Sequence, residues 1–428
     1  MVGNETSHSP LPFLLLLTLA LILAGCQDPE ATATQAEEVS YARANSPEHA
    51  GAPYVLLISI DGYRYDYNAL YAPENLTRFA LEGVEARSLI PGYPSDTFPN
   101  HYGIVTGMFP GTHGIVANNF FDPSRAARYS LNDPATVTDG TWYSGTPLWT
   151  AAELEGMITA SYFWAGSEAE IGGVRPTYYE VYSSSVPHAD RIRQVLDWLS
   201  YPQEYRPHFI TLYFSSVDTA GHDAGPDSDR VREAVLGLDR DLGTLFDGLE
   251  AIDPPVNVFI VSDHGMVALE PDKVIDIDAK ADLGGLRLVN LGSKVFLYSD
   301  DPERTERVYA QLKAGEANYR VFRNGETPDA WHAGNPRFGD VIVAADAPYT
   351  LVRANTEQEF PAGTHGYDPY LFPEVRGIFF ARGPDLARST TIPSFGSVHI
   401  YPLIMQLLGL ESPPDIDGRL EVLEGILN

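Results

Sequence analysis

The chain has 428 residues, of which 44% are hydrophobic and 20% are charged. This is the composition of a globular protein, and it excludes a largely disordered chain. With 58 acidic and 28 basic residues the formal net charge is -30, which argues against a surface for nucleic acids or other long polyanions. A small anionic substrate is still compatible with this charge if metal ions supply local positive charge.

The first predicted element is an apolar segment near the N-terminus. Residues 11–24 are almost wholly apolar and are followed by Gly25 and by Cys26, the single cysteine. The length of this run and the small residues at its end predict a signal peptide of an exported protein. The ending Leu-Ala-Gly-Cys resembles that of bacterial lipoproteins, in which cleavage leaves the cysteine as a lipidated N-terminus. The alternative is an uncleaved N-terminal anchor, because residues 2–10 hold no Lys or Arg.

We therefore expect residues 1–25 to be a lipoprotein signal peptide, with Cys26 as the lipidation site. The protein would lie in the periplasm and touch the membrane only through this lipid anchor. The outer membrane is expected, because Gln27 rather than Asp follows the cysteine. Residues 26–52 are rich in Ala, Glu, Thr and Pro, which predicts a flexible tether in front of a folded domain over residues 53–428.

Three short apolar runs in the folded domain predict strands. They are Val55–Ile60, His208–Phe214 and Val256–Val261, and they lack the alternation of a half-exposed strand. Helical patterns lie between them, most clearly over about Asp227–Ala251, where apolar residues recur three or four positions apart. This order predicts an α/β fold, with a mostly parallel sheet sandwiched by helices.

A later segment, residues 273–351, has a different pattern and predicts a small inserted α+β subdomain. Its expected strands are Lys294–Tyr298, Tyr319–Phe322 and Asp340–Ala344, and its expected helix is Pro302–Leu312. The chain is expected to return to the main sheet near residues 376–380.

Each of the three apolar runs leads into an aspartate. Asp61 follows the first, Asp218 comes shortly after the second, and Asp263 follows the third together with His264. An aspartate after a strand is often only a turn residue. Because ligands bind at the carboxyl ends of strands in α/β sheets, three such aspartates indicate a functional site at one edge.

Two further histidines complete a candidate metal site. His222 lies four residues after Asp218, so that both side chains share one face of a helical turn, and His365 lies in a glycine-flanked loop. Zinc binds imidazole nitrogen and carboxylate oxygen, usually at four positions. Three aspartates and three histidines therefore suit two zinc ions, and paired metals roughly 4 Å apart suit phosphoryl transfer.

The candidate nucleophile is Thr97, at the expected start of a helix with Pro99 in its first turn. The positive end of a helix dipole favours a bound phosphoryl group at this position. A threonine hydroxyl is a weak nucleophile unless a metal or a base lowers its pKa.

Several segments carry a family pattern: Tyr93–Pro94, Thr97–Tyr102, Val105–Gly107, His113–Val116, Asn118, Asp218–His222 with Gly225–Pro226, Ser262–Met266 and His365–Asp368. Together they resemble the nucleotide pyrophosphatase/phosphodiesterase family of the alkaline phosphatase superfamily. The resemblance extends from about Tyr54 to the C-terminus and is weakest in the insertion. It implies an alkaline-phosphatase-like fold.

The resemblance also implies roles for individual residues. Asp218, His222 and His365 would hold one zinc ion, and Asp61, Asp263 and His264 the other, which also binds Thr97. Thr97 would attack phosphorus and form a nucleotidyl-threonine intermediate, whose hydrolysis releases a nucleoside 5'-monophosphate. Asn118 would donate a hydrogen bond to a non-bridging phosphate oxygen. Phe98 and Tyr182 would stack on the nucleobase, although most aromatic residues serve core packing.

One position departs from the family pattern: many relatives have Lys immediately before the nucleophile, and this chain has Asp96. This puts the preference for phosphate chains in doubt, because a carboxylate repels an anionic substrate unless it points away or neutralises a cation. His101, His113 and His399 are interpreted as structural.

Three alternatives to nucleotide hydrolysis remain at this point. The first is a lysophospholipid or glycerophosphodiester phosphodiesterase of the same superfamily. The second is a phosphate monoesterase, but such an enzyme usually has an Arg beside its nucleophile, and Ser95–Phe98 contains none. The third is a catalytically inactive lipoprotein that binds a ligand.

Overall fold

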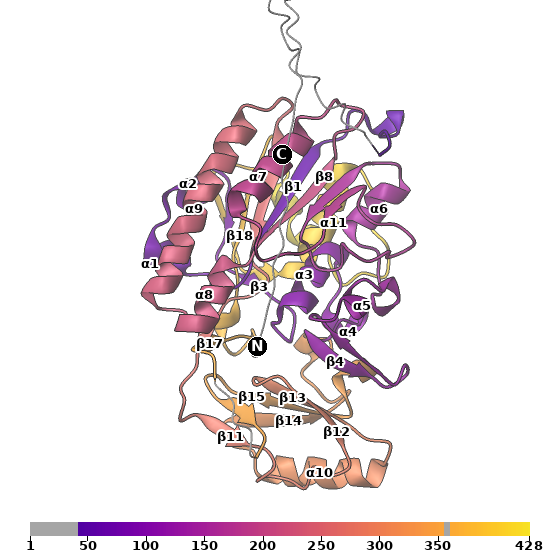
Figure 1. The fold of residues 1–428 in the computed structure, drawn as a ribbon, viewed down its shortest axis with the longest axis vertical. Coiled ribbons are helices and arrows are strands. Elements are labelled where there is room, and N and C mark those ends of the chain that lie inside the picture. The colour runs from indigo at the N-terminus through magenta and orange to yellow at the C-terminus, as the bar shows by residue number, and fades with distance from the viewer. Residues whose placement is uncertain (1–41, 355–359) are drawn as a thin grey trace, which may run out of the picture. The chain divides into compact units, whose positions relative to one another are not determined.

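The centre of the fold is an eight-stranded sheet (Figure 1). The computed structural model that contains it describes residues 42–354 and 360–428. In spatial order the strands are β19 (Thr390–Ile392), β2 (Val84–Ala86), β18 (Phe379–Arg382), β9 (Val256–Val261), β1 (Tyr54–Ile60), β8 (Phe209–Phe214), β6 (Thr159–Tyr162) and β7 (Tyr178–Glu180). Strands β9, β1, β8, β6 and β7 are parallel to one another, whereas β18 is antiparallel to β9 and β2. The prediction of a mostly parallel sheet is confirmed.

The three predicted apolar runs are adjacent strands. Strand β1 lies between β8 and β9, with Val55 opposite Phe209 on one side and Asn257 on the other. Every residue of β1 is buried. A central strand that is covered on both faces has no exposed side, which is why its sequence does not alternate.

Helices cover both faces of the sheet. On one face, Leu56, Ile58 and Ile60 of β1 share an apolar core with Val235 and Leu238 of the long helix α9. The helices of this layer are α2 (Glu74–Glu82), α7 (His188–Leu199), α8 (Ser216–Ala224) and α9 (Asp229–Glu250). Helix α9 lies where the spacing of its apolar residues predicts it.

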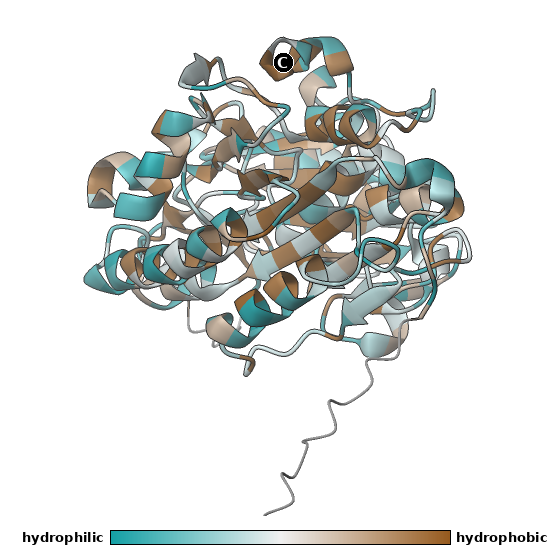
Figure 2. Cartoon of the chain, turned by 90° about the horizontal axis from the view of Figure 1, so that it is seen from above, coloured by the Kyte–Doolittle hydropathy of each residue, from teal (hydrophilic) through white to brown (hydrophobic). Residues whose placement is uncertain are grey.

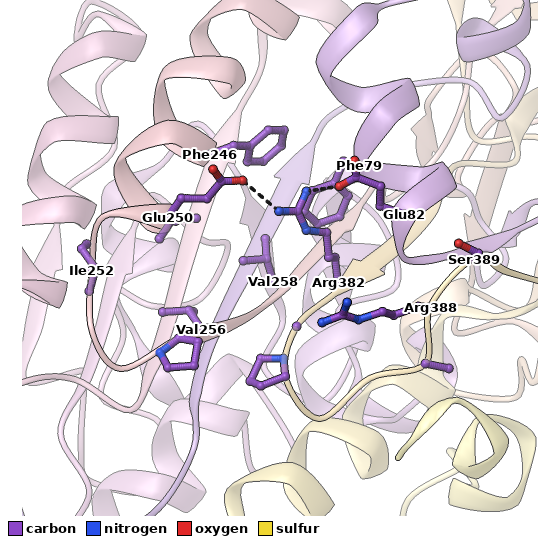
Figure 3. A pocket seen from close by; sticks show the side chains of 15 residues that line it. Phe79, Glu82, Phe246, Glu250, Ile252, Val256, Val258, Arg382, Arg388 and Ser389 are labelled. Carbon is purple, nitrogen blue, oxygen red and sulfur yellow. Dashed lines mark hydrogen bonds and ion pairs between the residues drawn. The ribbon is translucent and has the colours of Figure 1, made fainter.

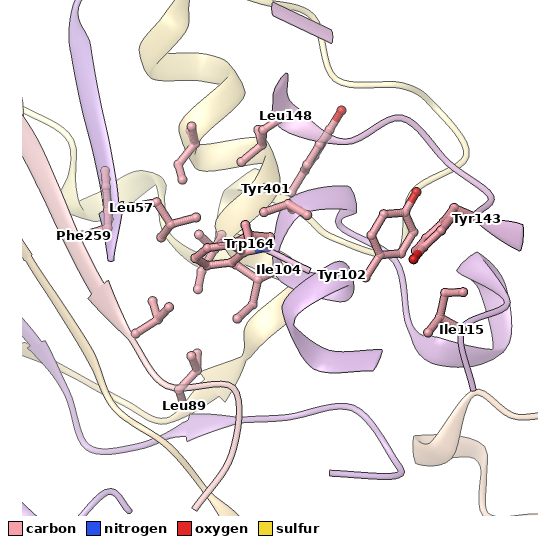
Figure 4. Packing of buried hydrophobic residues seen from close by; sticks show 14 of the residues in the cluster. Leu57, Leu89, Tyr102, Ile104, Ile115, Tyr143, Leu148, Trp164, Phe259 and Tyr401 are labelled. Carbon is pink, nitrogen blue, oxygen red and sulfur yellow. The ribbon is translucent and has the colours of Figure 1, made fainter. Parts of the chain in front are cut away.

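The opposite face is covered by α3 (Thr97–Thr106), α6 (Leu148–Leu154) and α11 (Ile400–Leu408). Figure 4 shows the packing of this core, in which Leu57 and Phe259 of the sheet lie beside Ile104 of α3 and Tyr401 of α11. In the view from above, the apolar residues concentrate along the central strands (Figure 2). The predicted nucleophile helix, α3, is therefore held by a packed core, which limits the motion of its first residue.

The inserted segment forms a second, four-stranded antiparallel sheet with one helix. In spatial order the strands are β12 (Arg287–Asn290), β13 (Lys294–Tyr298), β15 (Val341–Ala345) and β14 (Tyr319–Arg323), and the helix is α10 (Pro302–Ala314). Apolar residues of these elements, among them Val295, Val308 and Leu312, form a core of their own. Three strands and the helix lie within two residues of their predicted ends, and β12 was not predicted. The chain returns to the central sheet through β18.

Smaller elements connect these layers. They are α1 (Tyr67–Tyr71), α4 (Pro110–His113), α5 (Pro134–Val137), the hairpin of β4 (Asn119–Asp122) and β5 (Ala127–Ser130), and the strand pairs β3 (Leu89–Ile90) with β20 (Phe395–Gly396), β10 (Val267–Ala268) with β17 (Gly363–Thr364), and β11 (Val274–Asp276) with β16 (Thr350–Val352).

The predicted signal peptide, Cys26 and most of the predicted tether lie outside the described residues. The last part of that tether prediction, residues 42–52, is wrong. The side-chain nitrogen of Asn45 donates to the carbonyl oxygen of Arg206 at 2.8 Å, and its oxygen accepts from the backbone nitrogen of Ile158 at 2.6 Å. These bonds fix the segment to the folded domain, and composition does not reveal them. In the part of the chain that the structure describes, no helix has the length and apolar character needed to cross a membrane.

Candidate active site

The carboxyl ends of β1, β8 and β9 bring the predicted ligands to one edge of the central sheet. Asp61 follows β1 directly, Asp263 and His264 follow β9, and Asp218 lies in α8, which begins two residues after β8. Gly62 allows the close approach of two of these segments. Its φ is +67°, and a Cβ at this position would lie 2.8 Å from the Cα and Cβ of Asp218. The turn after β1 therefore requires glycine.

All six predicted ligands lie together. Five of them form two groups, and within each group the potential ligand atoms lie within 4.8 Å of one another. The first group is Asp61, Asp263 and His264, and the second is Asp218, His264 and His365. The first group is the set that the family resemblance implies for one ion. In the second, His264 stands where the resemblance implies His222, whose Nε2 lies 3.4 Å from Asp218 Oδ1. His264 is thus a member of both groups.

The three histidines share one hydrogen-bond pattern. Each has its Nδ1 within 3.0 Å of a backbone carbonyl oxygen: that of Gly363 for His222, of Gly265 for His264 and of Ser95 for His365. A carbonyl only accepts, so each Nδ1 carries the proton and each Nε2 presents a lone pair. This is the usual arrangement of a histidine that binds a metal through Nε2.

The carboxylates also fit a cation site. One oxygen of each aspartate, Asp61 Oδ1, Asp218 Oδ1 and Asp263 Oδ2, is buried and accepts no hydrogen bond from the described residues. The Nε2 of His264 lies 3.1 Å from Asp263 Oδ2 and 3.4 Å from Asp61 Oδ1. Buried polar atoms without partners are costly, and lone pairs at these distances repel unless a cation lies between them. The donor set suits divalent cations, and its mixture of imidazole and carboxylate suits zinc.

Burial and mutual repulsion shape the titration of this cluster. Burial raises the pKa of Asp61 well above its usual range, and the charges of Asp263 and Asp218 raise it further. Burial also raises the pKa of Asp263, but the imidazoles of His264 and His101 outweigh it and hold that pKa below its usual range. Burial lowers the pKa of His264 to about 4. Burial therefore favours the neutral imidazole of His264, and Asp61 resists ionisation in the absence of a cation.

The predicted nucleophile lies beside these ligands. Thr97 is the first residue of α3, and its Oγ1 lies 3.2 Å from Nε2 of His264. The backbone N–H of the next residue, Phe98, donates to Oδ1 of Asn118 at 2.9 Å. Because the side-chain oxygen of Asn118 accepts this bond, its NH2 group is free to donate to a phosphate oxygen.

His101 was interpreted as a structural residue from the sequence, but it contacts the site directly. Its Nε2 lies 2.7 Å from Ser59 Oγ, and its Nδ1 lies 2.9 Å from the carbonyl oxygen of Thr97 and 3.2 Å from Asp263 Oδ2. The side chain is 1% exposed. His101 therefore positions both the first turn of α3 and a predicted ligand. Its place four residues after Thr97 on one helix is the signal that could have revealed this.

Five other histidines of the described residues lie in ordinary structural environments. His113 and His399 bond to backbone groups, His188 pairs with Asp241, His208 stacks on Tyr54, and His332 stacks on Phe109.

A cavity of about 450 Å³ opens beside the cluster. It is lined by Thr97, Phe98, Asn118, Glu168 and Tyr182, together with four of the ligands, Asp61, Asp218, His222 and His365. The ring of Tyr182 is 5.3 Å from that of Phe163, and its backbone nitrogen donates to a carboxylate oxygen of Glu168 at 3.0 Å. Both aromatic residues expected at the nucleobase therefore line one cavity.

A larger cavity, of about 630 Å³, lies at the opposite end of the strands (Figure 3). It is lined by Val256 at the start of β9 and by Arg382, which pairs with Glu82 and Glu250. None of the predicted site residues lines it, and it lies at the amino end of a parallel strand, where α/β sheets rarely bind ligands. The smaller cavity is the candidate active site.

Asp96, the residue that departs from the family pattern, faces away from this cavity. Its Oδ1 lies 2.8 Å from Nζ of Lys294, which comes from β13 of the inserted sheet. Burial raises the pKa of Asp96, but the ammonium of Lys294 and the nearby imidazole of His365 outweigh it and hold that pKa below its usual range. The carboxylate therefore neutralises the ammonium of Lys294, and its charge does not repel an anionic substrate.

The sequence matches the family "Type I phosphodiesterase / nucleotide pyrophosphatase" over residues 55–368. It is 32% identical over 404 residues to ectonucleotide pyrophosphatase/phosphodiesterase family member 1 of Mus musculus, an alignment that covers 91% of this chain and 44% of the relative. An uncharacterised pyrophosphatase/phosphodiesterase of Schizosaccharomyces pombe is 34% identical, with 84% of this chain and 78% of the relative covered. The chain thus spans less than half the length of the mouse relative.

A solved structure of murine ectonucleotide pyrophosphatase / phosphodiesterase 5 has the same fold. It is an inactive threonine-to-alanine variant in complex with AMP. The superposition has a TM-score of 0.83 at 29% sequence identity, and it covers 88% of this chain and all of the murine chain. The fold is therefore alkaline-phosphatase-like, as the sequence resemblance implies. The family match over most of the chain, together with this fold, shows that the chain belongs to the type I phosphodiesterase / nucleotide pyrophosphatase family.

Proposed function

We propose that the protein is a two-zinc hydrolase that cleaves nucleotide phosphodiester or pyrophosphate bonds and releases nucleoside 5'-monophosphates. The observation that carries the proposal is the position of Thr97, whose hydroxyl oxygen lies 3.2 Å from Nε2 of His264. His264 is one of five clustered potential metal ligands, and the sixth, His222, has its Nε2 3.4 Å from Asp218 Oδ1. The same cavity continues to Phe98 and Tyr182. The AMP complex of the murine relative supports a nucleotide substrate.

The chain's own residues divide the chemistry between them. Two zinc ions held by the six ligands would neutralise charge on the phosphoryl group and lower the pKa of a hydroxyl nucleophile. Thr97 loses its hydroxyl proton to solvent, Oγ1 forms a bond to phosphorus, and the bond to the leaving oxygen breaks as that oxygen takes a proton from water. Water then attacks phosphorus, and Oγ1 leaves and regains a proton. Two in-line displacements retain the configuration at phosphorus.

Binding groups orient the substrate for the attack. The NH2 group of Asn118 donates to a non-bridging phosphate oxygen, and its position is set by the bond from the Phe98 backbone to its oxygen. Phe98 and Tyr182 stack on the nucleobase from two sides of the cavity. Stacking tolerates every base, because each has a π-face.

The proposal includes a location. Export is in keeping with the ectoenzyme relatives, and the Leu-Ala-Gly-Cys ending at Cys26 favours a lipid anchor on the periplasmic side of the outer membrane. The enzyme would then act on small nucleotides outside the cytoplasm.

A substrate panel tests the proposal. The p-nitrophenyl ester of thymidine 5'-monophosphate should be cleaved about ten- to a hundredfold faster than methyl p-nitrophenyl phosphate, in kcat/KM, because only the first has a base to stack. Acid-quenched protein should carry a nucleotidyl group on the peptide that contains Thr97. A preference for choline or glycerol diesters would instead favour a lysophospholipid or glycerophosphodiester phosphodiesterase. No turnover by zinc-saturated protein would favour an inactive binding protein.

A further inference from the structure

The cavity beside Thr97 offers little positive charge of its own. None of the described residues that line it is a lysine or an arginine. Its acidic lining residues are Asp61, Glu168 and Asp218. Lysine and arginine are the side chains that usually hold phosphate groups. Whatever cations the six ligands hold would face the reacting phosphoryl group, so a second or third phosphate of a substrate would find no cationic side chain on the cavity wall.

Lys294 is the lysine nearest to the nucleophile segment, and it is occupied. Its Nζ lies 2.8 Å from Oδ1 of Asp96, the residue before Thr97. The two side chains are only 1% and 6% exposed. A buried ion pair of this kind stays together because separating it would leave an uncompensated charge in the protein interior, which is strongly destabilising. Lys294 is therefore not available to a substrate phosphate.

The loop that carries His365 packs closely against the pair. Gly366, next to the predicted ligand His365, has a φ of +93°. A Cβ at this glycine would lie 2.5 Å from Nζ of Lys294 and 2.6 Å from Oδ1 of Asp96. The loop that carries His365 thus closes over the ion pair.

The pair changes the charge beside the nucleophile. Asp96 and Lys294 together contribute no net charge to the segment that precedes the nucleophile. Resting on the proposed nucleotide hydrolysis, we infer that the cavity favours monoanionic nucleotide diesters, whose leaving group carries no phosphate, over nucleoside triphosphates. The Asp96–Lys294 pair sets this preference by keeping the nucleophile segment neutral.

Charge-altering variants of the pair test the inference in the zinc-loaded enzyme. Asp96→Asn leaves the charge of Lys294 uncompensated. It should raise kcat/KM for ATP about three- to tenfold relative to kcat/KM for the p-nitrophenyl ester of thymidine 5'-monophosphate. The reason is that the uncompensated charge of Lys294 attracts the additional phosphates of ATP through a partly screened medium. The gain should shrink as salt rises from about 0.02 to 0.5 M. The double variant Asp96→Asn/Lys294→Met is neutral again and should lose the gain. Because each variant is compared between two substrates, a general loss of active protein cancels.

A second variant and a binding measurement complete the test. Asn132 is exposed and lines the cavity, so Asn132→Lys adds a cation without disturbing the core. It should favour ATP in the same ratio even if Asp96→Asn fails to fold. In calorimetry with zinc-loaded Thr97→Ala protein, ATP should bind no more tightly than the methyl ester of AMP.

Three outcomes would overturn the inference: binding of ATP more than about tenfold tighter than the methyl ester, an unchanged substrate ratio in Asp96→Asn, or an unchanged ratio in Asn132→Lys. Failure of the proposed function would look different, because the wild-type enzyme would then cleave neither nucleotide substrate.

Discussion

The hydroxyl oxygen of Thr97 and Nε2 of His264 lie 3.2 Å apart, although the two residues are 167 positions apart in the chain. Thr97 begins helix α3, and His264 follows strand β9. His264 belongs to both groups of potential metal ligands. This contact joins the expected nucleophile to the expected metal site.

Replacing the nucleophile should stop turnover and leave the metal site intact. Thr97→Ala removes Oγ1 but none of the six ligands, so zinc content and the thermal unfolding midpoint should stay close to those of the wild type. The decrease in kcat is expected to exceed about a thousandfold. Thr97→Ser is the matched control, because it keeps a hydroxyl group and should retain part of the activity. Activity of Thr97→Ala within a few-fold of the wild type would show that another group attacks phosphorus.

Metal content is the second prediction. Three buried carboxylate oxygens without hydrogen-bond partners, together with three Nε2 lone pairs, should hold close to two equivalents of zinc. Elemental analysis of the purified protein measures this. A chelator should abolish hydrolysis of bis-p-nitrophenyl phosphate, and added zinc should restore it. Full activity of metal-free protein would contradict the two-zinc site.

Tyr182 should contribute to specificity for nucleotides. Tyr182→Ala removes one stacking surface from the cavity and should lower kcat/KM for the p-nitrophenyl ester of thymidine 5'-monophosphate by about ten- to a hundredfold. The methyl ester has no base and should be nearly unaffected. Tyr179→Ala is the matched control, because Tyr179 is an exposed tyrosine of the nearby strand β7 that does not line the cavity. Equal losses on both substrates would mean that Tyr182 only supports the fold.

His113 should make the folded state sensitive to acid. Burial lowers the pKa of this histidine to about 3, whereas in the unfolded chain it stays near its ordinary value. The folded protein therefore holds His113 neutral. Its contribution to stability is complete above about pH 6.5 and is lost as the pH falls toward 3, because the unfolded chain then binds the extra proton.

Urea unfolding at pH 7 and pH 5 measures this effect. The free energy of unfolding should fall by about 1 kcal/mol per pH unit from this residue alone. His113→Gln cannot titrate, so its pH dependence should be weaker by that amount, whatever its overall stability. Parallel pH profiles of the two proteins would rule out His113 as the acid-sensitive group.

Cys26 should determine where the protein is found. If it is lipidated, Cys26→Ser should move the protein out of the membrane fraction after lysis without detergent. The activity of the released protein should be unaffected, because the residue precedes the folded domain that contains all six potential metal ligands. Equal recovery in membranes of wild type and variant would favour an uncleaved apolar anchor instead.

The positions of the three central strands and of the potential ligands after them were predictable from local signals. Val55–Ile60 and Val256–Val261 are continuous apolar runs because both faces of a central parallel strand are covered. Asp61 and Asp263 stand at the ends of these runs, and ligands in α/β sheets gather at that edge. His222 was predictable from its helical spacing to Asp218, and α3 from Pro99 in the first turn after Thr97.

The contacts that adjust the site were not predictable in this way. Lys294 and Asp96 are 198 positions apart, and no local pattern indicates that a residue of the inserted sheet will neutralise the residue before the nucleophile. Asn45 was assigned to a flexible tether because composition cannot show that its amide pairs with two distant backbone groups. His101 was interpreted as structural, although it bonds to the turn that carries Thr97 and lies against Asp263.

The sequence by itself determined the fold class, the family and the six potential ligands, because strand periodicity, turn residues and ligand spacing are properties of neighbouring residues. Only the tertiary structure decided that His264 belongs to both groups of potential ligands and which cavity lies beside these groups. It also decided whether Asp96 repels a substrate or neutralises Lys294. These features depend on side chains that are brought together by packing across the sheet edge and the insertion. The stability of such a pair depends on the burial and desolvation of both partners. The two partners are distant in sequence, so no periodic pattern along the chain indicates them.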